Sequence, residues 1–278
     1  MNKIYFAIVL HFHQPIGNFE DVLEKAFKSC YKPFFETLSN YPDIKAAFHI
    51  SGCLLDYFDK RHPKILDLVK QMVSRKQIEI MGGGYYEPII TAIPQKDLAG
   101  QINMMSDYVK ERFVHTPKGM WVAERVWDPA FAQVIHKAGV RYLILDDKHL
   151  LRSGIREEDL RGYFLTGKGK EKIAVFPSSK KLRYMIPFKL PHETIDYFKE
   201  IARAEEGVLI TYGDDGEKFG EWPGTHKWVY EENWLRNFFD ALIENKDWIE
   251  LVHFSDYLKN NKPAASLTIQ QGSYDEMM

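Results

Sequence analysis

Short apolar runs alternate with longer amphipathic segments along almost the whole chain, and this alternation restricts the possible fold more than any other feature. Several of the runs are continuously apolar, which is typical of parallel strands that are covered on both faces. We therefore expect strands at residues 4–10, 46–50, 78–81, 119–123, 142–145, 173–176, 208–211 and 249–254.

The segments between these strands carry helical patterns. In the stretch "HPKILDLVKQMVSRK", the apolar residues Ile65, Leu66, Leu68, Val69 and Val73 fall on one face at the helical period. Repeated strand–helix units favour a parallel sheet, and the sequence contains neither GxGxxG nor GxxxxGK[ST], so a nucleotide-binding fold has little support. The pattern predicts a closed barrel of parallel strands with helices outside.

Size and composition agree with a single barrel and exclude some partners. A barrel routinely reaches 278 residues, and a net charge of -2 gives no electrostatic reason to expect nucleic acid or an anionic membrane as partner. No apolar run approaches the roughly 20 residues of a membrane span. Two cysteines form no disulfide framework and no secretory signal is evident, so a cytoplasmic protein is expected. The sequence carries no signal for the oligomeric state.

Unusual polar and aromatic motifs follow five of the expected strands. The carboxyl ends of barrel strands share one face of the molecule, where barrel enzymes keep their active sites. The motifs are "HFHQP" (11–15), "GGGYYEP" (82–88), "ERVWDP" (124–129), "DDKH" (146–149) and "YGDDGEKFGEWPGT" (212–225). Each motif alone can be explained by core packing or a solvated turn, but five at the same end of the strands indicate a shared site.

The residue types in these motifs suggest the chemistry of glycosidic bonds. The sequence shows neither the GxSxG elbow of serine hydrolases nor the HExxH motif of zinc proteases. Acids and aromatic rings remain, and glycoside hydrolysis uses two carboxyl groups on either side of the scissile bond. Aromatic residues make up 14% of the chain and can stack on sugar rings. Glu124 and an aspartate of "GDDGE" could face each other across the barrel mouth.

With these motifs the chain resembles glycoside hydrolase family 57, and most closely its 4-α-glucanotransferases and α-amylases. "HFHQP", "GGGYYEP", "WVAERVWDP" and "YGDDGEKFG" look like four of the family's conserved regions, and "EKFGEWPGTHKWVYEENWL" extends the similarity. The resemblance covers essentially the whole chain. It implies an incomplete (β/α)7 barrel, so that one of the eight expected strands is peripheral or wrong.

The resemblance also implies roles for two acids. Glu124 matches the family's nucleophile and Asp215 its general acid/base, with the adjacent Asp214 as rival. The implied reaction is double displacement with retention on α-1,4-glucans such as maltodextrin, starch or glycogen. Transfer to another sugar, as in a 4-α-glucanotransferase, is expected, and α-amylase-type hydrolysis by water is the alternative.

Several further residues are expected to contact the glucan. His11 and His13 stand two apart and point the same way on an extended segment, which suits metal ligands or a buried structural pair equally well. The resemblance assigns them to sugar hydroxyls and implies neither a metal nor a cofactor. The remaining expected substrate-binding residues are Glu87, Trp121, Asp214 and Trp222, although packing roles compete for both tryptophans.

Family members are longer than this chain, which affects the expected domains. We expect the catalytic barrel at residues 1–260 and the start of a C-terminal helical segment, apparently truncated, at residues 261–278. Two further functions stay open at this stage. Truncation could leave an inactive carbohydrate-binding barrel, or the paired histidines could serve a metal-dependent polysaccharide deacetylase.

Overall fold

The computed structural model describes residues 1–274, in which strands and helices alternate as the sequence predicts. The strands are β1 (Ile4–Phe12), β2 (Ala46–Ile50), β3 (Ile78–Ile80), β4 (Gly119–Trp121), β5 (Tyr142–Asp146), β6 (Phe164–Lys168), β7 (Glu171–Ser178), β8 (Leu209–Asp215), β9 (Ile249–Leu251) and β10 (Ala265–Ser266). The helices are α1 (Glu20–Ala26), α2 (Lys32–Ser39), α3 (Gly52–Arg61), α4 (Pro63–Ser74), α5 (Gln95–Phe113), α6 (Ala132–Lys137), α7 (Asp147–Arg152), α8 (Lys180–Met185), α9 (Pro191–Ala204), α10 (Trp234–Glu244) and α11 (Phe254–Asn260).

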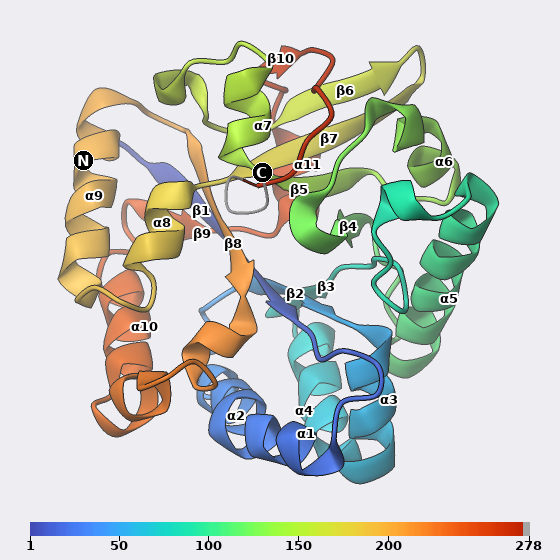
Figure 1. Cartoon of the computed structure of the whole chain (residues 1–278). Coiled ribbons are helices and arrows are strands. Elements are labelled where there is room, and N and C mark those ends of the chain that lie inside the picture. The colour runs from blue at the N-terminus through green and yellow to red at the C-terminus, as the bar shows by residue number, and fades with distance from the viewer. Residues whose placement is uncertain (275–278) are drawn as a thin grey trace.

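Seven parallel strands form a ring in the order β1, β2, β3, β4, β5, β7, β8, and β8 returns to β1. Helices surround this ring on the outside (Figure 1). All eight predicted strands are present, and the prediction of an incomplete (β/α)7 barrel is confirmed. The predicted eighth strand, β9, is the peripheral one, because it pairs only with the first three residues of β1. Sequence reasoning missed β6, which runs antiparallel to β7, and the short β10 beside it.

Two of the seams between neighbouring strands are weak. A single residue pair, Gly82 with Met120, joins the β3 end to β4, and a single pair, Ser178 with Thr211, joins β7 to β8. At the second seam the Ser178 side chain replaces backbone pairing, because its Oγ accepts from the Gly213 N–H at 3.0 Å and donates to the Gly213 carbonyl at 2.7 Å. The seams divide the ring into a first arc, β8-β1-β2-β3, and a second arc, β4-β5-β7.

Side chains of β1 alternate between the barrel interior and the surrounding helices, as period-2 geometry requires. Phe6, Ile8 and Leu10 join the apolar layer under the helices, whereas Ala7 and Val9 belong to the interior cluster. Continuing this alternation, His11 and His13 point inward as the strand leaves the barrel. The strand thus positions both histidines at the barrel mouth.

The segment after α11 differs from the predicted start of a helical segment. Residues 261–274 contain the strand β10 and extended chain, and no helix lies in this described part. Gly272 forms an antiparallel bridge with Trp127, which brings the segment to the end of β4. Residues 275–278 of the predicted segment lie outside the described residues. Within residues 1–274, no helix combines the length and apolar character needed to cross a bilayer.

Candidate active site

A cavity of about 260 Å³ opens at the carboxyl ends of β1, β4 and β8. It collects most of the residues that the sequence singled out, together with three that it did not. The lining residues are His11, His13, Trp121, Glu124, Arg125, Asp215, Glu217, Trp222 and Tyr274. Both predicted catalytic carboxyl groups therefore line one cavity, Glu124 from the end of β4 and Asp215 from the end of β8.

Strand alternation separates the two adjacent aspartates of β8. Leu209 belongs to the interior cluster, whereas Ile210 and Tyr212 face the helices, so Asp215 falls on the inner side and Asp214 on the outer side. Asp215 is paired in register with His11 of β1. The barrel geometry thus favours Asp215 over Asp214 as the carboxyl group that faces a ligand.

Asp214 is completely buried and holds an ionic network beneath the cavity. It accepts a hydrogen bond from Lys218, and its Oδ1 lies 3.5 Å from Arg183 Nε and 3.9 Å from Arg125 Nη2. Its Oδ1 also accepts from the Asp215 N–H at 3.0 Å. This position differs from the predicted sugar contact, because a side chain with no exposed surface anchors its neighbours instead of touching a ligand.

Glu124 lies on a tight turn with an uncommon backbone conformation. The turn Ala123–Arg125 follows β4, and Glu124 and Arg125 have φ values of 50° and 48° in the left-handed region. Glu87, also at the site, has a φ of 54°. Left-handed backbone is unfavourable for residues with a side chain, and such residues cluster at functional sites where the surrounding structure holds them.

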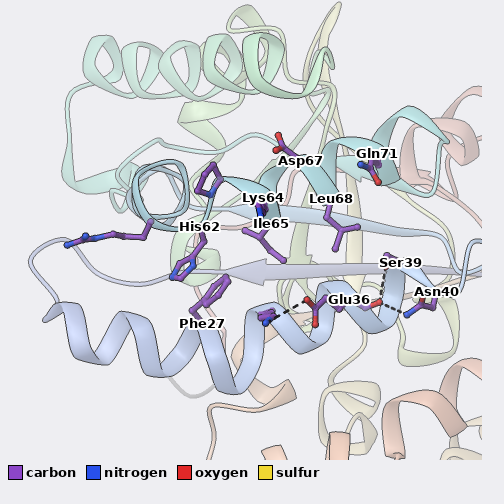
Figure 2. A pocket seen from close by; sticks show the side chains of 13 residues that line it. Phe27, Glu36, Ser39, Asn40, His62, Lys64, Ile65, Asp67, Leu68 and Gln71 are labelled. Carbon is purple, nitrogen blue, oxygen red and sulfur yellow. Dashed lines mark hydrogen bonds and ion pairs between the residues drawn. The ribbon is translucent and has the colours of Figure 1, made fainter.

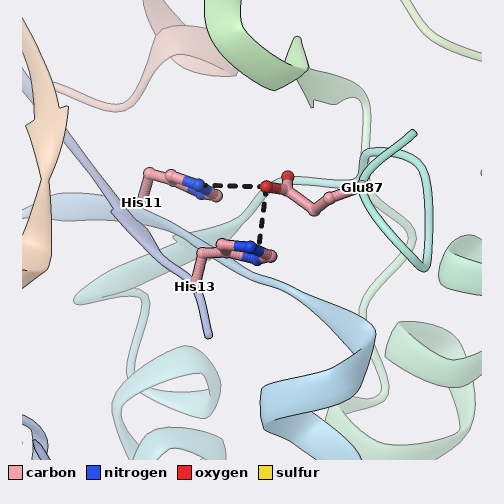
Figure 3. A group of neighbouring side chains, drawn as sticks. All are labelled: His11, His13 and Glu87. Carbon is pink, nitrogen blue, oxygen red and sulfur yellow. Dashed lines mark ion pairs between the residues drawn. The ribbon is translucent and has the colours of Figure 1, made fainter. Parts of the chain in front are cut away.

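Three histidines and one glutamate form a connected cluster on the first arc. Glu87 Oε2 lies 3.1 Å from His11 Nε2 and 3.4 Å from His13 Nδ1, and both rings point toward the carboxylate (Figure 3). His11 Nδ1 and His49 Nδ1 share a hydrogen bond of 2.8 Å. Trp121 stacks on His11 with ring centres 4.8 Å apart. The cluster makes His11 a rigid part of the cavity wall.

The cluster fixes the protonation of its members. Burial opposes ionisation of Glu87, but His11 and the two other histidines outweigh burial and hold the pKa of Glu87 at about 2. Burial also opposes a charge on His11, yet Glu87 raises the pKa of His11 above its ordinary value. Burial lowers the pKa of His49 to about 3, so His49 is neutral at neutral pH. Glu87 is thus an anion that orients His11 and His13.

The same atoms could accept a divalent cation. One nitrogen of His11, one of His13 and one oxygen of Glu87 lie within 4.8 Å of one another. Imidazole and carboxylate are the ligands of zinc and of non-haem iron. In the described structure each of the two histidines pairs with Glu87, and imidazole groups can also bind sugar hydroxyls by hydrogen bonds.

Glu217 lines the cavity and escaped the sequence analysis. Its Oε1 accepts hydrogen bonds from the His13 N–H at 2.9 Å and from Tyr31 Oη at 2.7 Å. Burial, together with the nearby Asp215, raises the pKa of Glu217 to about 8, although His11 opposes the rise. A half-buried carboxyl group that retains its proton at neutral pH therefore lies next to Asp215. The sequence "DDGEKFG" is typical of a solvated turn. Only the contacts made in the folded protein show that Glu217 is shielded from water.

Aromatic and cationic groups complete the cavity. Trp222 is 42% exposed and can present its ring to a sugar, whereas Trp121 is 2% exposed and mainly supports His11. Arg125 lies between the rings of Trp121 and Tyr274, 5.1 Å from each centre. Its Nε and Nη2 find no hydrogen-bond partner among residues 1–274, although Arg125 is buried. A polar ligand in the cavity could accept from these donors.

A larger cavity of about 1000 Å³ lies among the outer helices, remote in the sequence from the motifs that follow the strands. Its walls come from α2, α4 and the turns next to them, and His62 stacks on Phe27 at one end (Figure 2). Glu36, Lys64 and Asp67 give it an ordinary charged surface. The smaller cavity at the strand ends has the convergent acids and rings that a catalytic site needs.

Fold and site together define a class: a parallel α/β barrel with two carboxyl groups and aromatic rings at the carboxyl ends of its strands, as in enzymes that act on glycosidic bonds. The family described as glycosyl hydrolase family 57 matches residues 4–270. The chain belongs to this family.

Known relatives agree with this assignment. The chain is 44% identical to alpha-amylase 1 of Dictyoglomus thermophilum, over 99% of this chain and 40% of the relative. It is 41% identical to the 4-alpha-glucanotransferase of Thermococcus litoralis, over 100% of this chain and 42% of the relative. The crystal structure of a 4-alpha-glucanotransferase from Thermococcus litoralis superposes with a TM-score of 0.96, covering 100% of this chain and 43% of that one. The chain thus spans less than half the length of these relatives.

More distant structures share the fold alone. The alpha-amylase AmyC from Thermotoga maritima superposes with a TM-score of 0.76 at 14% identity, over 98% of this chain and 77% of that one. A probable polysaccharide deacetylase from Pseudomonas aeruginosa superposes with a TM-score of 0.63 at 11% identity, over 93% of this chain and 90% of that one.

Proposed function

We propose that this protein is a retaining α-glucan-active enzyme of the 4-α-glucanotransferase type, which disproportionates α-1,4-glucans by double displacement. The observation that carries the proposal is the single cavity lined by Glu124 and Asp215, with His11, His13 and Trp222 around them. The close relatives named 4-alpha-glucanotransferase and alpha-amylase support the choice of substrate.

In the first step, Asp215 donates a proton to the glycosidic oxygen while Glu124 attacks the anomeric carbon. The bond from that carbon to the leaving oxygen breaks, and an ester to the Glu124 carboxylate forms. A nucleophile in this reaction must be ionised, and an acid must hold a proton.

In the second step, Asp215 removes a proton from the 4-hydroxyl of an acceptor glucan, whose oxygen attacks the same carbon and releases Glu124. Water in place of the acceptor gives hydrolysis, the alternative outcome. Trp222 stacks on the sugar, while His11 and His13 bind its hydroxyl groups in the orientation that Glu87 sets. Arg125 donates to ligand oxygens from its Nε, which has no hydrogen-bond partner among residues 1–274.

Incubation of the protein with maltoheptaose, with and without EDTA, tests the proposal. We expect a ladder of shorter and longer α-1,4-glucans and no effect of EDTA. Release of glucose and maltose without longer products would instead indicate an α-amylase.

Two outcomes would contradict an enzyme of either kind. Unchanged maltoheptaose that still binds to the protein would indicate a binding barrel without activity. Loss of activity in EDTA, together with release of acetate from an acetylated polysaccharide, would place a catalytic metal on the cluster of His11, His13 and Glu87.

A further inference from the structure

The carboxylate of Glu124 has a hydrogen-bond donor that comes from far along the chain. Tyr274 Oη donates to Glu124 Oε2 at 2.7 Å, across a separation of 150 residues. Burial, and then the hydrogen bond with Glu124, raises the pKa of Tyr274 to about 12. The hydroxyl therefore keeps its proton and acts as a donor at any pH at which the protein works.

The residues just before Tyr274 form hydrogen bonds with the turn Ala123–Arg125 and with Trp127, which follows the turn. Gly272 and Trp127 exchange two backbone hydrogen bonds, of 2.8 Å from the Trp127 N–H and 3.0 Å from the Gly272 N–H. Trp127 Nε1 donates to the Ile269 carbonyl at 3.2 Å. Ser273 Oγ donates to the Glu124 carbonyl at 2.6 Å. Residues 269–274, which we name the clamp segment, thus contact the turn at its backbone before reaching the carboxylate.

The turn has a reason to need this support. Glu124 and Arg125 both have left-handed backbone, which a free turn with these side chains would leave for a less strained conformation. Any such relaxation would rotate the Glu124 side chain. The centre of the Tyr274 ring also lies 5.1 Å from the Arg125 guanidinium, which is at the same distance from the Trp121 ring, so Tyr274 contacts a second member of the turn.

We infer that the clamp segment positions the nucleophile, with Tyr274 as a positioning residue that binds Glu124 Oε2 and leaves Oε1 to attack the anomeric carbon. The inference rests on the proposed function, because it takes Glu124 as the nucleophile. No bond forms or breaks at Tyr274. Its hydroxyl donates the same hydrogen bond before and after the attack, and holds the carboxylate in the orientation that the attack requires.

Four variants test this inference: Tyr274→Phe, Tyr274→Ala, Ser273→Ala and a matched control. Tyr274→Phe removes only the hydroxyl and keeps the ring over Arg125, whereas Tyr274→Ala removes both. Ser273→Ala removes the hydrogen bond to the Glu124 backbone and leaves the one to its carboxylate. The control Tyr57→Phe removes a similar bond, from Tyr57 Oη to Glu24 Oε2 at 2.9 Å, outside the barrel mouth.

Each variant is treated with 5-fluoro-α-glucosyl fluoride, which forms the ester with the nucleophile and hydrolyses slowly, and labelling is followed by intact mass and peptide mapping. We expect labelling of Glu124 to slow about 10- to 100-fold in Tyr274→Phe, the range for a hydrogen bond to a charged group. Tyr274→Ala should be slower still, and Ser273→Ala should lose less. In turnover of maltoheptaose, kcat should fall while KM and the melting temperature change little.

The outcomes separate the two proposals. Labelling of Glu124 at equal rates in the wild type, Tyr274→Phe and Tyr57→Phe would overturn the clamp and leave the nucleophile in place. An equal fall of labelling in Tyr57→Phe would also overturn it, because the effect would then be general. A wild-type protein labelled at another residue would remove Glu124 as nucleophile, and the clamp with it.

Discussion

The two arcs of the barrel bring their acids to the cavity by different means. On the first arc, Asp215 follows from the regular alternation of β8, and the neighbouring His11 follows from that of β1. On the second arc, β4 ends after three residues and Glu124 projects from a left-handed turn that a distant segment holds. An ordinary strand end places the acid/base candidate, whereas long-range hydrogen bonds place the nucleophile candidate. The position of Asp215 is therefore encoded locally, whereas that of Glu124 depends on the whole fold.

The largest expected effects come from removing one acid from each arc. Glu124→Ala should lower turnover at least about 1,000-fold while sparing sugar binding, and Asp215→Ala should lower it about 100- to 10,000-fold. When azide is added with an α-glucosyl fluoride as substrate, the two variants should form different products. It should give the β-glucosyl azide in Glu124→Ala, where it replaces the nucleophile, and the α-glucosyl azide in Asp215→Ala, where it attacks the glycosyl-enzyme.

The stereochemistry of the azide product is measured by NMR. If Glu124→Ala gave the α-glucosyl azide and Asp215→Ala the β-glucosyl azide, the roles of the two acids would be exchanged. Retained turnover in Glu124→Ala would remove it as nucleophile.

A smaller effect should separate two glutamates of the first arc by pH. The pKa of Glu217 is raised to about 8 from 4.5, so its folded state binds the proton more tightly and stability declines as pH rises through this interval. The pKa of Glu87 is lowered to about 2 from 4.5, so its contribution is complete above 4.5 and is lost as pH falls toward 2. Glu217→Gln and Glu87→Gln should therefore change the free energy of unfolding in opposite directions.

Chemical denaturation at pH 5 and pH 8.5 measures this difference. Glu217→Gln should raise the free energy of unfolding at pH 8.5 by on the order of a few kcal/mol relative to pH 5, and Glu87→Gln should lower it by a similar amount at both pH values. A pH-independent effect of Glu217→Gln would show that this carboxyl group does not retain its proton.

The smallest expected effect concerns the exposed ring at the cavity rim. Trp222→Ala should raise KM for maltoheptaose about 3- to 10-fold, the range for loss of one aromatic stacking contact, with little change in stability. Trp248→Phe, a half-buried ring in the loop before β9 at the opposite end of the barrel, provides the control. Equal KM values for Trp222→Ala and the wild type would show that Trp222 does not stack on the sugar.

The difference between the arcs also explains what the sequence could predict. The apolar runs predicted eight strands, and all eight are present in the structure. The position of the motifs after these strands predicted a site at one face of the barrel. The alternation of Leu209, Gly213 and Asp215 on one side of β8 is readable from the sequence and would have separated Asp215 from Asp214. These signals are local, since each depends on neighbours within a few residues.

The features of the site that the sequence did not predict depend on contacts between residues that are remote in the chain. Glu217 accepts a hydrogen bond from Tyr31, which lies 186 residues away in the chain, so the residues next to Glu217 in the sequence do not predict this contact. Tyr274 belongs to a segment that was expected to begin a helix, and its contact with Glu124 depends on the bridge between Gly272 and Trp127. The left-handed conformation of Glu124 likewise could not be predicted, because neither Glu124 nor Arg125 is a residue type that favours it.

The two single-pair seams described in the barrel have a mechanical consequence. They run between β3 and β4 and between β7 and β8, so Asp215 and Glu124 belong to half-shells that the backbone fastens loosely to each other. The spacing of the two acids therefore depends on the few backbone pairs and the side-chain contacts that cross these seams. In the proposed function, a glucan lying across the mouth would contact Trp222 on one half-shell and Arg125 on the other, and would hold this spacing fixed while it reacts.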